Sequence, residues 1–158
     1  MIIGVMSDSH GDGVAIEKAV DAIGEVDFWL HAGDFCSDAA SLAEYAGKKV
    51  YAVAGNCDGL AAKSKVDEFL TVEGKKIWLT HGHQSSVKYG TDDLIWNAKQ
   101  YGVDIVIYGH THISEISRYD DLYVINPGSV ARPYHVTAPT CLRLTINKQE
   151  VSADLIEL

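Results

Sequence analysis

The stretch MIIGVMSDSHGDGVAIEKAVDAIGEVDFWLHAGD, from Met1 to Asp34, decides the fold class. Met1–Met6 is an apolar run with the length and composition of a buried strand, and Phe28–His31 is a second one. Between them, apolar residues recur at helical spacing over Val14–Ile23. A strand, a helix and a strand in this order predict two parallel strands joined by a crossover helix, which is the unit of an α/β protein.

The rest of the chain extends this unit and then changes character. Ala39–Ala46 is predicted to be a helix and Val50–Val53 a strand, whereas the second half contains hairpin patterns and is expected to be antiparallel. Its expected elements are two strands about a Glu73-Gly74-Lys75 turn (Val66–Val72 and Lys76–Thr80), a helix (Thr91–Tyr101), three strands (Ile105–Tyr108, Ile113–Tyr119 and Leu122–Ile125) and a last hairpin (Thr140–Ile146 and Glu150–Ile156). Two sheets packed together, with helices outside, would accommodate both halves in a single domain over residues 1–158.

Composition excludes several classes of protein. A length of 158 residues with 47% apolar residues suits one globular domain, and no apolar run is long enough to span a membrane. The N-terminal segment is unlike a signal peptide, and Cys36, Cys57 and Cys141 are odd in number and scattered, so we expect reduced thiols and a cytoplasmic protein. The net charge of −9 argues against non-specific binding of nucleic acids. The negative net charge does not exclude a small phosphate-bearing substrate, because bound metal ions would reverse the local electrostatic field.

Side chains that can bind metals follow five of the predicted strands. The five segments are Ser7-Asp8-Ser9-His10, His31-Ala32-Gly33-Asp34, Ala54-Gly55-Asn56-Cys57-Asp58, Thr80-His81-Gly82-His83 and Gly109-His110-Thr111-His112. Taken singly, each has an ordinary explanation, such as a helix cap for Asp8, a turn for Asp34 or Asn56, and a partly buried histidine for His81 or His83. Together they favour a metal site, because ligands bind at the carboxyl ends of the strands in α/β sheets.

The pair His110 and His112 favours metal binding even when it is considered alone. Alternate residues of a strand point to the same face, so both rings are expected to point the same way. Gly109 is expected to keep the turn tight, and Thr111 is expected to be only a spacer.

The ordered set of motifs resembles the calcineurin-like metallophosphoesterase superfamily, and within it the small phosphodiesterases of the YfcE type. Asn126-Pro127-Gly128-Ser129 also resembles that subfamily, so the likeness covers most of the chain. The resemblance implies a four-layer α-β-β-α sandwich of two mixed sheets. It also implies a ligand set in which Asp34 bridges two metal ions. One ion is then bound by Asp8, His10 and His112, and the other by Asn56, His81 and His110.

This mixture of ligands has its own chemical preferences. Imidazole, carboxylate and amide groups suit borderline divalent ions, so we expect Mn²⁺ or Ni²⁺ first, with Fe²⁺, Zn²⁺ or Mg²⁺ as alternatives. Two ions about 3.5–4 Å apart clamp the attacking and leaving oxygens of a phosphoryl displacement, with a bridging hydroxide as the nucleophile. The expected activity is hydrolysis of phosphodiester bonds with inversion at phosphorus. Asp34, Asn56 and His110 are the expected catalytic residues.

Cys57 departs from the pattern of many relatives, which carry a histidine there that is thought to protonate the leaving group. A neutral thiol is a poor acid in that role, so diesters and activated aryl esters are expected to be better substrates than alkyl monoesters. A metal-bound water or His83 is an alternative acid, and Cys57 is equally explained as a small packed residue.

Two other functions compete with the phosphodiesterase. One is a phosphomonoesterase or nucleotide phosphatase, and the other is a non-catalytic scaffold like the retromer subunit that resembles this family. Each remaining polar candidate has an alternative structural explanation. Asp58 either contacts a metal ligand or caps a turn, and His31 either contacts a metal ligand or is a core residue. Asn126 either supports a ligand or forms a turn. Arg132 either contacts phosphate or forms a surface ion pair. Trp29, Trp78 and Trp96 are expected in the core, and a homodimer or a larger oligomer is an open alternative to a monomer.

Overall fold

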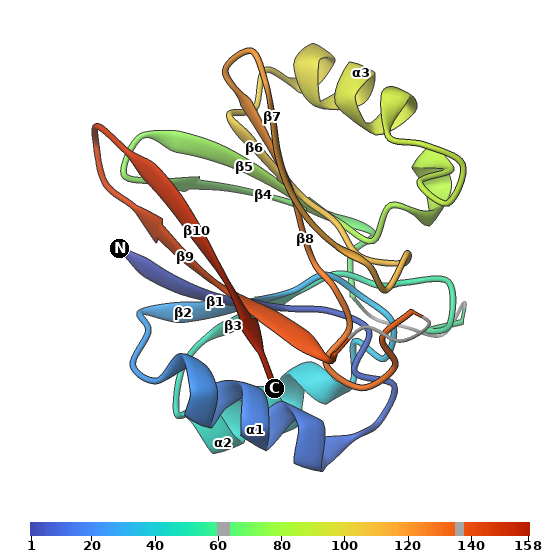
Figure 1. Cartoon of the computed structure of the whole chain (residues 1–158), viewed down its shortest axis with the longest axis vertical. Helices are drawn as coiled ribbons and strands as arrows, with labels where there is room; N and C mark the ends of the chain where they lie inside the picture. The colour runs from blue at the N-terminus through green and yellow to red at the C-terminus, as the bar shows by residue number, and fades with distance from the viewer. Residues whose placement is uncertain (60–63, 135–137) are drawn as a thin grey trace.

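Two five-stranded sheets lie face to face in the computed structural model, which describes residues 1–59, 64–134 and 138–158 (Figure 1). The first sheet has the order β10-β9-β1-β2-β3, and the second has the order β4-β5-β6-β8-β7. The strands of the first sheet are β1 (Ile2–Met6), β2 (Phe28–His31), β3 (Val50–Ala52), β9 (Thr140–Ile146) and β10 (Val151–Glu157). The strands of the second sheet are β4 (Asp67–Val72), β5 (Lys75–Thr80), β6 (Ile105–Ile107), β7 (Ser114–Tyr119) and β8 (Leu122–Pro127).

Helices cover the outer face of each sheet. Helices α1 (Gly13–Ile23) and α2 (Asp38–Ala46) lie on the first sheet, and α3 (Asp92–Tyr101) lies on the second (Figure 1). A short 3-10 helix, η1 (His83–Ser85), follows β5. This is the four-layer α-β-β-α sandwich that the resemblance implied, and the fold class is confirmed.

Both sheets are mixed, and the pairing of the second sheet corrects one expectation. Strands β1, β2 and β3 are parallel, and β9 joins β1 in antiparallel fashion. In the second sheet β5, β6 and β8 are parallel, so the prediction of an antiparallel second half was wrong for these strands. The reason is that α3 returns the chain so that β6 runs parallel to β5. Strand β8 then inserts between β6 and β7, rather than following β7 at the edge.

Apolar side chains fill three layers between these elements. The layer between the sheets is aliphatic, with Ile3, Leu30, Ile77 and Ile105 fully buried. Trp29 lies under α1 and α2, and Trp78 lies under α3, as expected of core residues. Trp96 is 63% exposed, so its placement in the core was wrong. It lies two positions from both Leu94 and Ala98, which form the buried stripe of α3, and therefore points away from the sheet.

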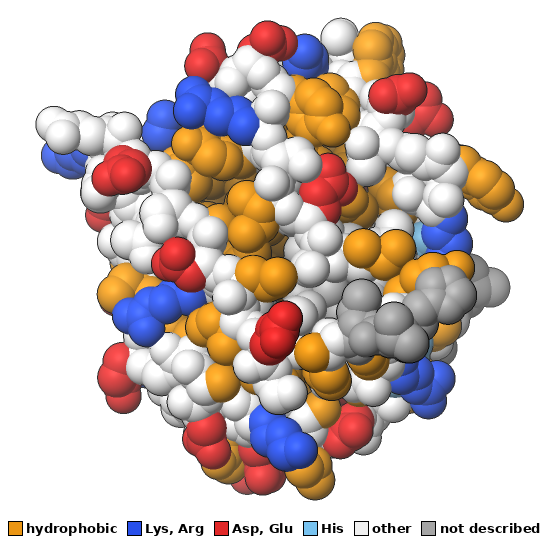
Figure 2. All heavy atoms as spheres, viewed as in Figure 1, with side chains coloured by type: hydrophobic (Ala, Val, Ile, Leu, Met, Phe, Trp, Pro, Cys, Tyr) orange, Lys and Arg blue, Asp and Glu red, His pale blue; other side chains and the backbone are white. Residues whose placement is uncertain are grey.

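Strands β10 and β7 are the edge strands on one side of the sandwich. Figure 2 shows acidic and basic side chains interspersed over this face, with hydrophobic side chains reaching the surface in the middle. Among the described residues, no helix is long and apolar enough to cross a membrane.

Candidate metal centre

Loops from both sheets meet at one end of the sandwich, because the parallel strands β1, β2 and β3 of one sheet and β5 and β6 of the other all end there. The five polar segments predicted from the sequence lie in these loops. Asp8 does not cap helix α1. The N-cap is Asp12, whose side chain accepts the Ala15 N–H at 3.0 Å.

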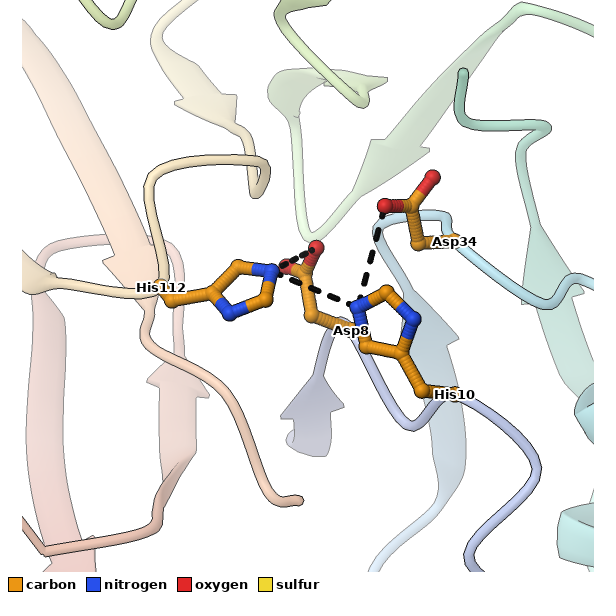
Figure 3. A group of neighbouring side chains, drawn as sticks. All are labelled: Asp8, His10, Asp34 and His112. Atoms are coloured by element: carbon orange, nitrogen blue, oxygen red, sulfur yellow. Dashed lines mark hydrogen bonds and ion pairs between the residues drawn. The ribbon is translucent and has the colours of Figure 1, made fainter. Parts of the chain in front are cut away.

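Four side chains form a first cluster whose candidate ligand atoms lie within 4.8 Å of one another: Asp8, His10, Asp34 and His112. Figure 3 shows the two rings and the two carboxylates pointing toward one another from three different loops. Nε2 of His112 lies 3.1 Å from Oδ1 of Asp8 and 3.3 Å from Nε2 of His10. Nε2 of His10 lies 3.8 Å from Oδ2 of Asp34.

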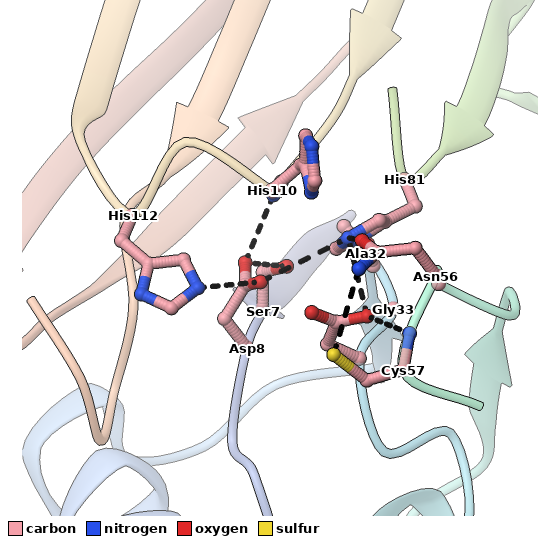
Figure 4. A network of polar contacts seen from close by, with 12 residues as sticks. Ser7, Asp8, Ala32, Gly33, Asn56, Cys57, His81, His110 and His112 are labelled. Atoms are coloured by element: carbon pink, nitrogen blue, oxygen red, sulfur yellow. Dashed lines mark hydrogen bonds and ion pairs between the residues drawn. The ribbon is translucent and has the colours of Figure 1, made fainter. Parts of the chain in front are cut away.

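Asp34 also belongs to a second cluster, in which its carboxylate and the rings of His81 and His110 bring ligand atoms within 4.8 Å of one another. Nε2 of His81 lies 3.3 Å from Oδ1 of Asp34 and 3.1 Å from Oδ1 of Asn56. Figure 4 shows Asn56, His81 and His110 beside Asp8 and His112 of the first cluster. The structure therefore brings together all seven residues of the expected ligand set, with Asp34 between the two groups.

The orientation of two histidine rings places nitrogen lone pairs opposite oxygen lone pairs, with no hydrogen between them. His112 donates its Nδ1–H to the carbonyl of Arg132 at 2.5 Å, and His81 donates its own to the carbonyl of Ala32 at 2.7 Å. In a neutral ring the remaining nitrogen, Nε2, is an acceptor, and in both residues it faces carboxylate or amide oxygens. Only an added proton or a cation can hold such acceptors together. Ring nitrogens anchored on a carbonyl in this way are the usual arrangement of histidines that bind metals.

The electrostatics of the centre also favour a bound cation. Burial alone would raise the pKa of Asp34, but hydrogen bonds from the protonated form of His81 and from the Cys57 N–H hold the pKa well below its ordinary value. The hydrogen bond to Asp8 raises the pKa of His112. Burial opposes the charged form of His81, but contacts with Asp34 and Asp8 raise its pKa above the ordinary value. The donor set of carboxylate, imidazole and amide groups fits borderline divalent ions.

Residues 1–149 match the calcineurin-like phosphoesterase superfamily domain. The chain belongs to this superfamily. It is 34% identical to a phosphodiesterase of Methanocaldococcus jannaschii, over 99% of this chain and 100% of that one. It is 33% identical to phosphodiesterase YfcE of Escherichia coli K12, over 54% of this chain and 46% of that one. A crystal structure of a predicted phosphoesterase from Streptococcus pneumoniae has a TM-score of 0.83 at 28% identity, covering 99% of this chain and 88% of that one. The predicted family is therefore confirmed, and with it the class of the enzyme as a hydrolase.

Five of the candidate ligands in this phosphoesterase have left-handed backbone conformations. The φ angles are 54° for Asp8, 48° for His10, 53° for Asp34, 70° for His110 and 58° for His112. Such conformations cost non-glycine residues on the order of 1–3 kcal/mol each and concentrate at functional sites. They also correct the expected geometry of His110 and His112. The two residues lie in a bend beyond β6, so strand alternation does not direct their rings.

Two glycines of the phosphoesterase motifs allow the loops to approach closely. A Cβ at Gly109 would lie 2.1 Å from Oγ of Ser7 and 2.8 Å from Oδ2 of Asp8. A Cβ at Gly55 would lie 2.2 Å from Oδ1 of Asp34. The need for glycine at position 109 thus comes from the Asp8 loop that packs against it, not from a tight turn. The hydroxyl of Ser7, for which the sequence indicated no role, donates to Oδ2 of Asp8 at 2.6 Å.

The loop that carries His110 and His112 is held from behind by Asn126. Its Nδ2 donates to the carbonyl of Gly109 at 3.1 Å and to Oγ1 of Thr111 at 3.0 Å, and its Oδ1 accepts the N–H of Gly128 at 2.9 Å. Thr111 is therefore not only a spacer, as the sequence suggested, because its hydroxyl anchors the loop. Asn126 lies in β8 rather than in a turn, and it supports the ligand loop through its backbone.

His31 does not reach the clusters but joins two of their loops. It is fully buried, and its Nδ1 accepts the N–H of Gly33 at 3.3 Å. Nε2 then carries the proton and donates to Oγ of Ser9 at 2.8 Å, and Ser9 donates to Oδ2 of Asp38 at 2.6 Å. This one-way chain of hydrogen bonds fixes the loops of His10 and Asp34 relative to α2. Nothing in the sequence singled out Ser9 or Asp38 beyond their proximity to the motifs.

Asp58 organises the loop after β3 by accepting the N–H groups of Cys36 and Gly55, both at 2.7 Å. The exposed side chain of Arg132 forms no ion pair among the described residues, whereas its carbonyl anchors His112.

His83 and Cys57 lie beside the His81 cluster. The ring of His83 is centred 5.4 Å from that of His81 and 6.1 Å from that of His110, and its buried Nδ1 has no partner among the described residues. Cys57 is exposed. Partial burial and the neighbouring Asp34 raise the pKa of its thiol to about 11, so it is neutral at pH 7.

Proposed function

We propose that this chain is a phosphodiesterase that uses two divalent metal ions. The observation that carries the proposal is the position of the Asp34 carboxylate, which belongs to both clusters. In these clusters Nε2 of His81 and Nε2 of His112 are acceptors in the neutral rings and face other acceptors, so a cation is needed between them. Relatives named as phosphodiesterases, one of them at 34% identity over the whole chain, support the same activity. The reaction adds water across the phosphoester bond and yields a phosphomonoester and an alcohol or phenol.

The proposed ligands divide into two sets that share Asp34. Asp8, His10 and His112 form one set. Asn56, His81 and His110 form the other. Mn²⁺ or Ni²⁺ suits these donors best, with Fe²⁺, Zn²⁺ or Mg²⁺ as alternatives. When bound, two such ions would hold the oxygens of a phosphate and would lower the pKa of a water molecule near phosphorus. The chain supplies the orientation of two of these rings, because His81 and His112 are each held by a backbone carbonyl before the substrate arrives.

A diester suits the site better than an alkyl monoester. The thiol of Cys57 is neutral, so it holds no charge that would bind a dianionic phosphate and is a weak acid for an alkoxide leaving group. Burial lowers the pKa of His83, so this ring is neutral at pH 7 and unable to act as a cationic acid. Leaving groups that depart without a strong acid, such as phenols, should therefore react fastest.

The test is a comparison of two aryl substrates with metal-free protein to which Mn²⁺ or Ni²⁺ is restored. We expect hydrolysis of bis(p-nitrophenyl) phosphate to exceed that of p-nitrophenyl phosphate at equal concentration, and EDTA to abolish both. A faster monoester reaction would support the phosphomonoesterase instead. Absence of turnover of both substrates with either Mn²⁺ or Ni²⁺ would support a non-catalytic scaffold.

We further propose that residues 1–158 form one domain that acts in the cytoplasm on a small substrate without binding nucleic acids non-specifically. The aliphatic layer shared by both sheets supports one domain. The three free thiols support a reducing compartment, and the net charge of −9 opposes nucleic-acid binding. A homodimer or larger oligomer remains a proposal that sedimentation would test.

A further inference from the structure

A cavity of about 480 Å³ opens directly beside the metal centre. Its inner wall is the ligand loop of His110, Thr111 and His112, and its outer wall is formed by Val87, Lys88, Ile113 and Tyr134. The volume is within the usual range for sites that hold small organic molecules. Because the cavity and the two clusters share His110 and His112, a phosphate held at the centre would direct one of its ester groups into this cavity.

The outer wall combines apolar surface with one positive charge. Ile113 is 46% exposed and Tyr134 is 51% exposed, so both offer hydrophobic surface to an occupant. The backbone N–H of Tyr134 donates to the carbonyl of His112 at 3.2 Å, which fixes this wall relative to a candidate ligand. An organic group is thus more suitable than water alone as the occupant.

Lys88 is the charged residue of this wall. Other lysines of the described chain, such as Lys65 and Lys99, form ion pairs with nearby carboxylates, whereas Lys88 has no such partner among the described residues. In a protein with a net charge of −9, an unpaired cation beside the reaction centre attracts an anionic part of the substrate.

We propose that this cavity, defined by Val87, Lys88, Ile113 and Tyr134, is a subsite for the organic group of the substrate, and that Lys88 binds a second phosphate carried by that group. The inference rests on the proposed phosphodiesterase function and narrows its substrate class. The substrate is then a diester in which one esterified group carries a further phosphate, such as an ester of a nucleoside bisphosphate. Lysine suits a phosphate as a compact point charge with three donors.

Two substrates that differ by one phosphate test this assignment. Thymidine 5′-(p-nitrophenyl phosphate) and its 3′-phosphorylated form release the same p-nitrophenol, so the ratio of their kcat/KM values isolates the second phosphate. With the Mn²⁺-loaded protein we expect about a fivefold to tenfold preference for the 3′-phosphorylated form, the scale of a partly exposed charge-assisted hydrogen bond. The Lys88→Gln variant should bring the ratio close to one, and Lys88→Arg should restore most of it. Lys99→Gln is the matched control, because it removes a paired surface lysine and should leave the ratio as it is.

A binding measurement separates failure of the subsite from failure of the enzyme. Calorimetric titration of the Mn²⁺-loaded protein with thymidine 3′,5′-bisphosphate and with thymidine 5′-phosphate needs no turnover. Tighter binding of the bisphosphate that Lys88→Gln abolishes supports the subsite even if no substrate is hydrolysed. Equal binding of the two nucleotides, or a preference that survives in Lys88→Gln, overturns it. Hydrolysis of bis(p-nitrophenyl) phosphate together with that outcome leaves the phosphodiesterase standing.

Discussion

Nε2 of His81 lies 3.1 Å from Oδ1 of Asn56, and in the neutral ring both atoms are acceptors. The tautomer follows from the other nitrogen of the ring, which donates to the Ala32 carbonyl, and the amide orientation agrees with the contact between Nδ2 of Asn56 and Sγ of Cys57 at 3.6 Å. Two acceptors at hydrogen-bond distance repel each other unless a proton or a metal ion lies between them. Among the residues that the structure describes, this contact is the clearest local sign of a cation site.

The division of ligands predicts separate effects for variants on the two sides. Asn56→Ala removes an oxygen beside His81, and His112→Ala removes a nitrogen beside Asp8. We expect each variant to retain about one tightly bound ion where the native protein retains two, as measured by elemental analysis after dialysis. The Asn147→Ala variant, in an exposed turn, is the matched control and should bind both ions. Loss of both ions from each variant would contradict the division.

Gly109 gives a prediction about close packing. In Gly109→Ala the new methyl group would overlap Oγ of Ser7 and Oδ2 of Asp8, so the Asp8 loop must shift. We expect a loss of stability of about 1–3 kcal/mol, as for other overpacked sites, together with weaker metal binding. Gly13→Ala is the control, because a Cβ there meets nothing within 4 Å and the residue begins a helix. Chemical denaturation and metal titration of the two variants would measure the difference, and equal behaviour would refute the packing argument.

Asn126 gives a prediction about support from behind the ligand loop. Asn126→Ala leaves the Gly109 carbonyl and the Thr111 hydroxyl without their buried donor. Removing such a partner costs about 1–3 kcal/mol of stability. We expect kcat/KM to fall about 10-fold to 100-fold, the range seen when partners of metal ligands are removed, with the metals still bound at high concentration. If only stability changed and the activity of the folded variant stayed native, Asn126 would be a core residue and nothing more.

Cys57 tests the account of substrate preference. Cys57→His places an imidazole beside Asp34, where it is able to protonate a leaving group. We expect hydrolysis of an alkyl phosphomonoester to rise while that of bis(p-nitrophenyl) phosphate changes little, because a phenol departs without an acid. Cys57→Ser is the control, since it preserves the size of the side chain without adding an acid. Unchanged activity of the histidine variant on the alkyl monoester would show that the missing acid is not the cause.

The stereochemistry at phosphorus tests direct attack by water. Hydrolysis of a chiral phosphorothioate ester in isotopic water should proceed with inversion of configuration. The proposal assigns the attack on phosphorus to a water molecule and to no side chain of the protein. Retention would indicate a covalent intermediate on the protein.

The sequence predicted the fold, and it predicted which seven side chains lie close together, more accurately than it predicted how their loops are held. The period of Val14–Ile23 and the apolar runs of Met1–Met6 and Phe28–His31 report local structure, which is why α1, β1 and β2 were expected correctly. The parallel pairing of β6 and β8 was not foreseen, because the insertion of β8 between β6 and β7 is a long-range choice without a local signal. The left-handed conformations of His110 and His112 were likewise hidden, since a residue with a Cβ rarely reveals such a conformation in sequence. Ser7, Ser9 and Asp38 act through tertiary contacts, and short polar residues beside a motif look the same whether buried or exposed.

Stepwise addition of Mn²⁺ to the metal-free protein tests the central claim most directly. Two Mn²⁺ ions held by the two proposed ligand sets would both be bound by Asp34, which belongs to both clusters, and would be close enough for their electron spins to couple. Electron paramagnetic resonance would then report their proximity, and bis(p-nitrophenyl) phosphate hydrolysis would report activity. We expect activity to rise mainly with the second equivalent of Mn²⁺, together with a spin-coupled signal that Asp34→Asn abolishes. Full activity after one equivalent, with no coupled signal at two, would contradict a dinuclear phosphodiesterase.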